Sequence, residues 1–117
     1  AALGVAQMEI FDKILEAKQD LALKYSEYFK QTAIKMIRPI EGVKANNWLN
    51  AIMLENIDKR DEFLSITNQQ GIMTRPIWNL LSELPHYKNC ENDGLTNSKM
   101  LVEKVVNIPS SVPNGVI

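Results

Sequence analysis

An arginine followed three residues later by a tryptophan is the combination in this sequence best suited to ligand binding. Arg75 and Trp78 lie in residues 71–78, which read GIMTRPIW. A guanidinium donates paired hydrogen bonds to an anion, and an indole ring offers a large, flat apolar face. Such a pair suits a phosphorylated or nucleotide-linked ligand. The structural alternative is that Arg75 forms a surface ion pair and Trp78 fills an edge of the core.

Other side chains that often carry catalysis are sparse. The one histidine, His86, and the one cysteine, Cys90, both lie in a stretch rich in Asn, Gly and Pro. We expect His86 to be a solvent-exposed loop residue, and Cys90 has Lys88 nearby but no evident base. The two together are too few for an ordinary zinc site. The sequence shows no glycine-rich phosphate loop and no nucleophile-elbow motif.

The composition indicates the broad class of protein. The chain has 117 residues, of which 45% are hydrophobic, and a formal net charge of −1. This length suits one domain with one core, and the near-neutral charge argues against nucleic-acid binding. No apolar stretch reaches the roughly 18 to 20 residues of a membrane span, and a single cysteine cannot form an internal disulfide. These features predict a cytoplasmic protein.

The first third of the chain predicts a single long helix. Residues 1–31 contain no proline, and apolar residues recur there at spacings of three and four: Ile10, Ile14, Ala17, Leu21, Tyr25 and Tyr28. A helix of about 30 residues would be about 45 Å long. Because that is longer than a domain of this size needs, we expect the helix to pack on something else as well.

The middle of the chain predicts a strand followed by a helix. Residues 46–54 are mainly apolar on both faces, as in a central strand, with Asn50 as a buried amide satisfied by neighbouring backbone. A helix is predicted over residues 59–70. Asp58 would be its N-cap, and Gly71 would supply the left-handed residue after its end.

Four further segments complete the expected order. Pro76 confines the strand predicted over residues 72–78 to a sheet edge or terminus. Residues 85–95 are predicted to be loop, Thr96 to cap a helix that runs to Lys104, and residues 105–109 to be extended. The order predicts an α/β (α+β) fold, with a small, mostly antiparallel sheet, packed helices and a long helix in front.

Five segments resemble a known family. Residues 1–8 are similar to the AAxGxAQL helix of the DegT and StrS class of pyridoxal-phosphate-dependent sugar aminotransferases. Four later segments resemble the carboxy-terminal part of that family in the same order: residues 46–54, 71–78, 84–87 and 107–111. Within the class the strings are most similar to the LegC-like branch, which aminates a nucleotide-linked 4-keto-6-deoxy sugar on the way to legionaminic-type nonulosonic acids.

The resemblance implies the C-terminal small domain of a fold-type I aminotransferase that works as a homodimer. In that family the lysine that binds pyridoxal phosphate (PLP) and the acid that pairs with its pyridine nitrogen lie upstream, in the large domain. The lysines here, such as Lys44 and Lys99, have no matching context. No catalytic, cofactor-binding or metal-binding residue is therefore expected in this chain. Arg75 and Trp78 are the predicted substrate-binding residues.

Residues 1–32 are expected to be an inter-domain helix and residues 33–117 a small C-terminal α/β domain. The chain would then be a fragment of a longer protein, inactive without the large PLP domain. The family implies that the parent moves an amino group from glutamate to a nucleotide-linked 4-keto-6-deoxy sugar, in surface polysaccharide or nonulosonic acid biosynthesis. One alternative is a non-catalytic α/β module that binds a small ligand or a protein. The other is a self-contained enzyme that uses His86 or Cys90.

Overall fold

The computed structural model describes residues 2–112, which divide into two compact units. The first unit holds the described residues up to Asn50 together with those from Pro109 onward, and the second is Ala51–Ile108. The outer ends of the two predicted domains, Ala1 and residues 113–117, lie outside the described residues. The domain boundary expected after residue 32 stays a prediction.

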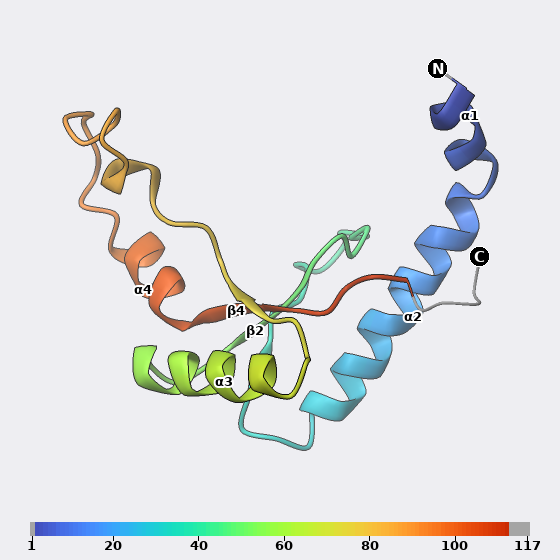
Figure 1. Cartoon of the computed structure of the whole chain (residues 1–117), viewed down its shortest axis with the longest axis horizontal. Coiled ribbons are helices and arrows are strands. Elements are labelled where there is room, and N and C mark those ends of the chain that lie inside the picture. Colours follow the sequence, from blue (N-terminus) through green and yellow to red (C-terminus); the bar gives the residue numbers. More distant parts are fainter. Residues whose placement is uncertain (1, 113–117) are drawn as a thin grey trace. The chain divides into compact units, whose positions relative to one another are not determined.

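The predicted long helix is interrupted. The first unit has α1 (Ala2–Glu9) and α2 (Phe11–Phe29), which follow each other along the chain (Figure 1). Ile10 lies between them, and its N–H donates to the carbonyl of Gln7, three residues back, at 3.3 Å. This tighter turn replaces one α-helical hydrogen bond, so the prediction of one continuous helix is wrong at Ile10. The helical pattern resumes when Ile14 N–H donates to the Ile10 carbonyl at 3.1 Å.

Two side chains of α2 hold residues that are far away in sequence. Lys18 Nζ donates to the carbonyl of Ser110 at 2.7 Å, and the Tyr25 hydroxyl donates to the carbonyl of Pro109 at 3.0 Å. Residues seven apart lie on nearly the same face of a helix, so Lys18 and Tyr25 reach one segment together. Ala17 is the one buried residue of α2.

Asn50 joins this arrangement through its backbone. Its N–H donates to Ser110 Oγ at 2.7 Å, and the residue is only 3% exposed. The prediction that Asn50 is buried is confirmed. The prediction that neighbouring backbone satisfies its side-chain amide is wrong, because within residues 2–112 the Asn50 Nδ2 has no hydrogen-bond partner. The nearby serine hydroxyl is engaged with the main-chain N–H of Asn50 instead of its amide group.

Burial raises the pKa of the Tyr25 hydroxyl above its ordinary value, because the phenolate is penalised when desolvated. The pKa is higher in the folded chain than in the unfolded chain. The contribution of the protonated hydroxyl to the free energy of unfolding is therefore fully present below about pH 10, and it is lost as the pH rises through the folded pKa. We expect the free energy of unfolding of the wild-type chain to fall more between about pH 9 and pH 11 than that of Tyr25→Phe. Urea unfolding at the two pH values tests this, and equal losses would contradict it.

The second unit contains three neighbouring strands in the order β2-β4-β3. These are β2 (Asn50–Met53, whose first residue belongs to the first unit), β3 (Arg75–Pro76) and β4 (Val105–Ile108). The core of the unit is aliphatic and lies on and beside these strands: Ile52, Leu54, Val105, Val106 and Ile108. The strand predicted over residues 46–54 therefore exists but starts later. The remaining strand, β1 (Lys35–Met36), belongs to the first unit.

The strand β2 is shorter than predicted because Trp48 and Leu49 do not belong to it. Both were predicted to lie in the strand, yet Trp48 is 64% exposed and Leu49 is 38% exposed. Asn47 has a left-handed backbone with a φ of +49°, which is incompatible with an extended strand. The Asn46 side chain also accepts a hydrogen bond from the Trp48 N–H at 3.0 Å, which closes a local turn.

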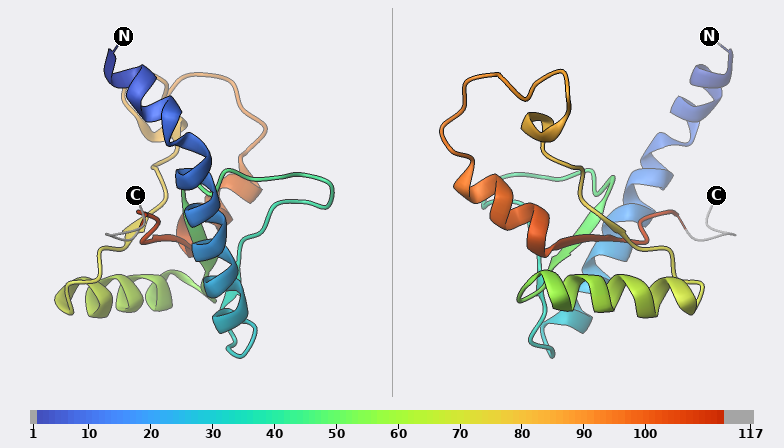
Figure 2. Two further views of the ribbon diagram at one scale, coloured as in Figure 1. Left: turned by 90° about the vertical axis from the view of Figure 1, so that its right-hand side faces the viewer. Right: turned by 60° about the vertical axis from the view of Figure 1, so that its left-hand side comes forward.

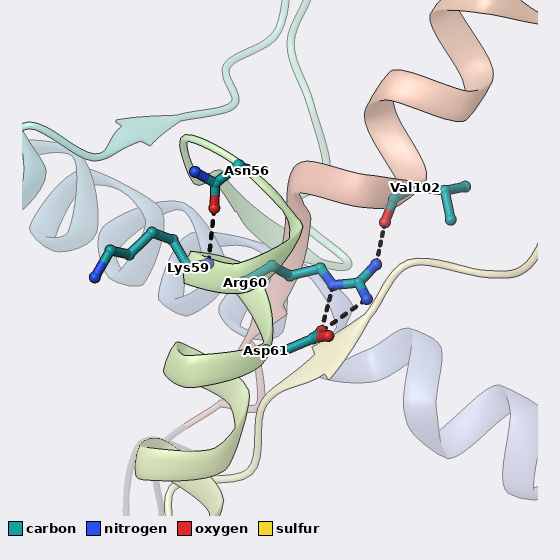
Figure 3. Close-up of polar contacts among 5 residues, drawn as sticks. All are labelled: Asn56, Lys59, Arg60, Asp61 and Val102. Carbon is teal, nitrogen blue, oxygen red and sulfur yellow. Dashed lines mark hydrogen bonds and ion pairs between the residues drawn. The ribbon is translucent and has the colours of Figure 1, made fainter.

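The helix α3 (Ile57–Gln69) begins two residues before the predicted start. Its N-cap is Asn56, whose Oδ1 accepts a hydrogen bond from the backbone N–H of Lys59 at 2.9 Å (Figure 3). The prediction of Asp58 as N-cap is wrong, because Asp58 already lies in the first helical turn. There its charge still favours the positive end of the helix dipole.

We expect Asn56→Ala to lower the free energy of unfolding by about 1 kcal/mol, because the Lys59 N–H would lose its acceptor. Asp58→Asn keeps the size of the side chain and removes only its charge, so its expected loss is smaller, about 0.3 kcal/mol. Thermal unfolding followed by circular dichroism compares the two variants. A larger loss for Asp58→Asn would show that the cap has been assigned to the wrong residue.

The second unit ends with α4 (Thr96–Lys104), which passes directly into β4 (Figure 2). Thr96 is the first helical residue and not the predicted cap, because the N-cap is Leu95 in a left-handed conformation. The short 3-10 helix η1 (Leu81–Glu83) precedes residues 85–95, which contain neither helix nor strand, as predicted. This loop projects away from α3 in both views of Figure 2.

Candidate functional site

The strand that carries Arg75 is held on one side by β4. The pairing is antiparallel, with Arg75 opposite Asn107 and Pro76 opposite Val106. β3 is the last strand of the sheet order, so the predicted edge position of Pro76 is confirmed. An edge suits proline because it lacks the N–H that a further strand would need. The strand covers only two residues, which is shorter than the predicted range of 72–78.

The side chain of Arg75 is exposed, and Nη2 lies 3.7 Å from the sulfur of Met73. Within residues 2–112 no carboxylate forms an ion pair with Arg75. A thioether is a weak hydrogen-bond acceptor, so the guanidinium keeps most of its donor capacity for an anion. The structural alternative of a surface ion pair is therefore not what the structure shows.

Trp78 follows β3 by two residues and is 67% exposed. The alternative in which it fills an edge of the core does not fit that exposure. Met73, on the other side of Arg75, is 65% exposed. The segment thus presents a cation between two large apolar side chains along the chain. The role of Arg75 and Trp78 in substrate binding stays a prediction.

Arg60, in the same unit, differs from Arg75 because its guanidinium is held by other residues of the chain (Figure 3). Its Nε and Nη2 lie 2.8 Å and 2.7 Å from Asp61 Oδ1, and its Nη1 donates to the carbonyl of Val102 at 2.6 Å. Its side chain is only 14% exposed. The bond to Val102 satisfies one of the last carbonyls of α4 and ties that helix to α3. No sequence pattern singles out Arg60 for this role.

Within residues 2–112, Lys59, His86 and Cys90 lie in exposed surroundings and do not form a catalytic site. The pKa of Lys59 is raised, mainly by the hydrogen bond from its ammonium group to Glu62 at 2.7 Å, but this pair is exposed. His86 and Cys90 are exposed in the loop, as predicted for His86. A nucleophile needs a base within hydrogen-bond reach, and the structure of residues 2–112 gives Cys90 none. Among these residues no group of three potential ligands could hold a metal.

The described residues do not fit a PLP site. Lys44 and Lys99 are exposed, so neither has the enclosed surroundings that a cofactor-bound lysine needs. Every Asp and Glu side chain in residues 2–112 is also exposed, which leaves no buried carboxylate to pair with a pyridine nitrogen. No helix of this part of the chain combines the length and the apolar character needed to cross a membrane.

The second unit is thus an α/β arrangement of helices and a small sheet, with an arginine and a tryptophan exposed at or next to its edge strand. The sequence model of the DegT/DnrJ/EryC1/StrS aminotransferase family matches residues 1–113. The chain therefore belongs to that family, which confirms the resemblance predicted from the five segments.

Two other proteins are similar to this chain. The curated GDP-perosamine synthase of Vibrio cholerae is 29% identical over 113 residues, covering 94% of this chain and 31% of that protein. A structure described as a sugar aminotransferase from Streptococcus pneumoniae, in its PLP form, has a TM-score of 0.82 at 22% identity, with 93% of this chain and 29% of that chain covered.

A third relative extends the likeness in fold. PseC of Helicobacter pylori, an aminotransferase involved in the biosynthesis of pseudoaminic acid, matches with a TM-score of 0.84 at 17% identity, covering 95% of this chain and 31% of that chain. These structures confirm the predicted fold class. The chain spans 31% of the length of the curated relative, so it corresponds to about a third of such a protein.

Proposed function

We propose that this chain is the C-terminal part of a PLP-dependent aminotransferase that aminates a nucleotide-linked 4-keto-6-deoxy sugar. Glutamate is the proposed amino donor, and the product would enter surface polysaccharide or nonulosonic acid biosynthesis in the cytoplasm. The family match and the similarity to a GDP-perosamine synthase support amination of a sugar. The LegC-like strings support the finer substrate class. A homodimer is proposed on the family resemblance.

The work would be divided between two parts of the longer protein. PLP supplies an electron sink when bound, and the lysine and acid that hold it would lie outside this chain. This chain would bind and orient the substrate. Arg75 would donate to phosphate oxygens of the nucleotide, and Trp78 would pack against an apolar or planar face of the ligand.

The observation that carries the proposed role in substrate binding is the state of Arg75. It is exposed at a sheet edge, and within residues 2–112 it has no carboxylate partner, whereas Arg60 in the same unit is held by Asp61 and Val102. A hydrogen bond to a charged group contributes about 1.5 to 3 kcal/mol. An arginine that keeps its donors available for such bonds is suited to an anionic ligand.

Two preparations test the proposal: the longer protein that contains this chain, and the 117-residue chain alone. We expect the longer protein to bind PLP and to aminate a GDP- or UDP-linked 4-keto-6-deoxy sugar with glutamate. The isolated chain should form no borohydride-reducible PLP adduct at a specific lysine. A stable adduct at one lysine of the chain would contradict the proposed division of labour.

The family match favours this proposal over the non-catalytic module. The same experiment separates the two, because a module of that kind needs no cofactor. A longer protein that binds a nucleotide sugar, but neither takes up PLP nor transfers nitrogen, would support the module and overturn the proposed amination.

A further inference from the structure

A polar cluster lies where α3 gives way to β3. It is made by Thr67 and Asn68 in the last turn of α3 and by Thr74, the residue directly before Arg75. Thr74 is only 4% exposed. We call these three residues the Thr74 clamp. All of them belong to the second unit.

The clamp forms a directed chain of hydrogen bonds. Asn68 Nδ2 lies 3.0 Å from Thr74 Oγ1, Thr74 Oγ1 lies 2.6 Å from Thr67 Oγ1, and Thr67 Oγ1 donates to the carbonyl of Phe63 at 2.7 Å. Because Thr67 donates its one proton to the helix carbonyl, Thr74 is the donor between the two hydroxyls. Thr67 Oγ1 then donates once and accepts once, while Thr74 Oγ1 donates to Thr67 and shares one of the two Asn68 Nδ2 protons with another acceptor.

Asn68 also holds the backbone. Its Nδ2 donates to the carbonyl of Thr74 at 3.1 Å and to the carbonyl of Leu64 at 2.7 Å. Two carbonyl oxygens as neighbours fix the orientation of the Asn68 amide, since its own oxygen could not bond to them. The Thr74 carbonyl and the Arg75 nitrogen share one planar peptide group. Asn68 therefore orients the peptide from which Arg75 projects.

The helix does not need these side chains in order to end. The Ile72 N–H donates to the Thr67 carbonyl at 2.9 Å, and the Gly71 N–H donates to the Asn68 carbonyl at 3.0 Å. Gly71 has a φ of +77°, so the three features together form a complete Schellman motif. The bonds of the Thr74 clamp come in addition to a helix end that is already satisfied by backbone.

What the clamp adds is a second restraint on Arg75. On one side, β4 holds the residue through the pairing of Arg75 with Asn107. On the other side, the clamp ties the preceding peptide to α3. The side chain itself stays exposed. A ligand-binding group whose backbone is held in place loses less freedom on binding, which strengthens the interaction.

We propose that Thr74, Thr67 and Asn68 are positioning residues that hold Arg75 in place for the phosphate groups of the nucleotide-linked substrate. The inference rests on the proposed function, in which Arg75 meets that substrate. Thr74 acts through Arg75 and touches no ligand itself.

The test uses the longer protein with PLP bound, and GDP and UDP as probes. Thr74→Val keeps the shape of the side chain but removes its hydroxyl, so we expect the dissociation constant of the better-bound nucleotide to rise about 3- to 10-fold. Thr74→Ser keeps the hydroxyl and should restore binding. Ser65→Ala is the matched control, because that exposed hydroxyl on α3 bonds only to Gln69 among the described residues.

A second pair of measurements separates positioning from simple loss of structure. The reaction with glutamate alone should keep its rate in Thr74→Val, because in the proposed function Arg75 binds the phosphate groups of the nucleotide and not the amino donor. Thr74→Val in an Arg75→Ala background should weaken nucleotide binding no further, since its effect acts through Arg75. A further loss in that background, or an equal slowing of the glutamate reaction, would overturn the positioning role.

The outcomes also distinguish this inference from the proposed function. If Arg75→Ala weakens nucleotide binding and Thr74→Val does not, the clamp proposal is wrong and the binding role of Arg75 stands. If Arg75→Ala itself leaves nucleotide binding unchanged, the proposed site is wrong, and the clamp proposal is overturned with it.

Discussion

Arg75→Ala in the longer protein is expected to lower kcat/KM for the nucleotide-linked sugar about 10- to 100-fold, because about 1.5 to 3 kcal/mol of charge-assisted hydrogen bonding to phosphate is lost. The Arg75 side chain is exposed and makes a single weak hydrogen bond, to Met73, within the described residues. Its removal should therefore leave the fold intact. The reaction of the enzyme with glutamate should proceed at its normal rate.

Two further variants sharpen this prediction. Arg75→Lys keeps the charge but loses the planar pair of donors, so we expect an intermediate loss. Arg38→Ala removes an exposed arginine from a loop of the first unit and should change kcat/KM less than 2-fold. Steady-state kinetics with varied nucleotide sugar, and single-turnover spectra with glutamate, supply the two readouts. An equal loss in both reactions would count against a substrate-binding role for Arg75.

Ile52→Ala is expected to give the largest loss of stability, about 2 to 5 kcal/mol in the free energy of unfolding. Ile52 is fully buried in β2, the strand that lies next to β4 in the sheet. Alanine would leave a cavity in a core that has few other large buried side chains. Ile52→Val removes one methylene group and should cost about 0.5 to 1.5 kcal/mol.

Ile40→Ala is the control for that experiment. Ile40 is 78% exposed, so the same change in side chain should alter stability by less than about 0.5 kcal/mol. Urea unfolding of the purified chain, followed by tryptophan fluorescence and circular dichroism, measures all three variants. If Ile52→Ala and Ile40→Ala had similar effects, the placement of Ile52 at the centre of the second unit would be wrong.

Several elements were predictable because their signals are local. Gly71 marks the end of α3, since only a residue that tolerates a positive φ fits there. Pro76 identifies an edge strand through its missing N–H, and the sheet order agrees. The composition of residues 85–95 excludes regular structure, and the structure has none there.

The errors occur where competing local signals are close in strength. Asn56 and Asp58 are both good N-caps by residue type, and the structure uses Asn56, so that α3 starts two residues before the predicted position. Thr96 is likewise a good cap by type, but the left-handed Leu95 starts α4 instead. At Ile10 the hydrophobic pattern continues while the backbone changes its hydrogen bonding, which a periodicity cannot show.

By itself, the sequence determined the family, the order of the elements and the choice of Arg75 and Trp78 as the residues to examine, because these depend on residue types within short segments. Only the tertiary structure decided that Arg60 is held by Asp61 and Val102 while Arg75 stays exposed. The hydrogen bonds of the Thr74 clamp are likewise visible only in the tertiary structure. The contacts from Arg60 to Val102 and from Thr67 and Asn68 to Thr74 join different segments, and their distances follow from how a helix, a turn and a strand pack in space.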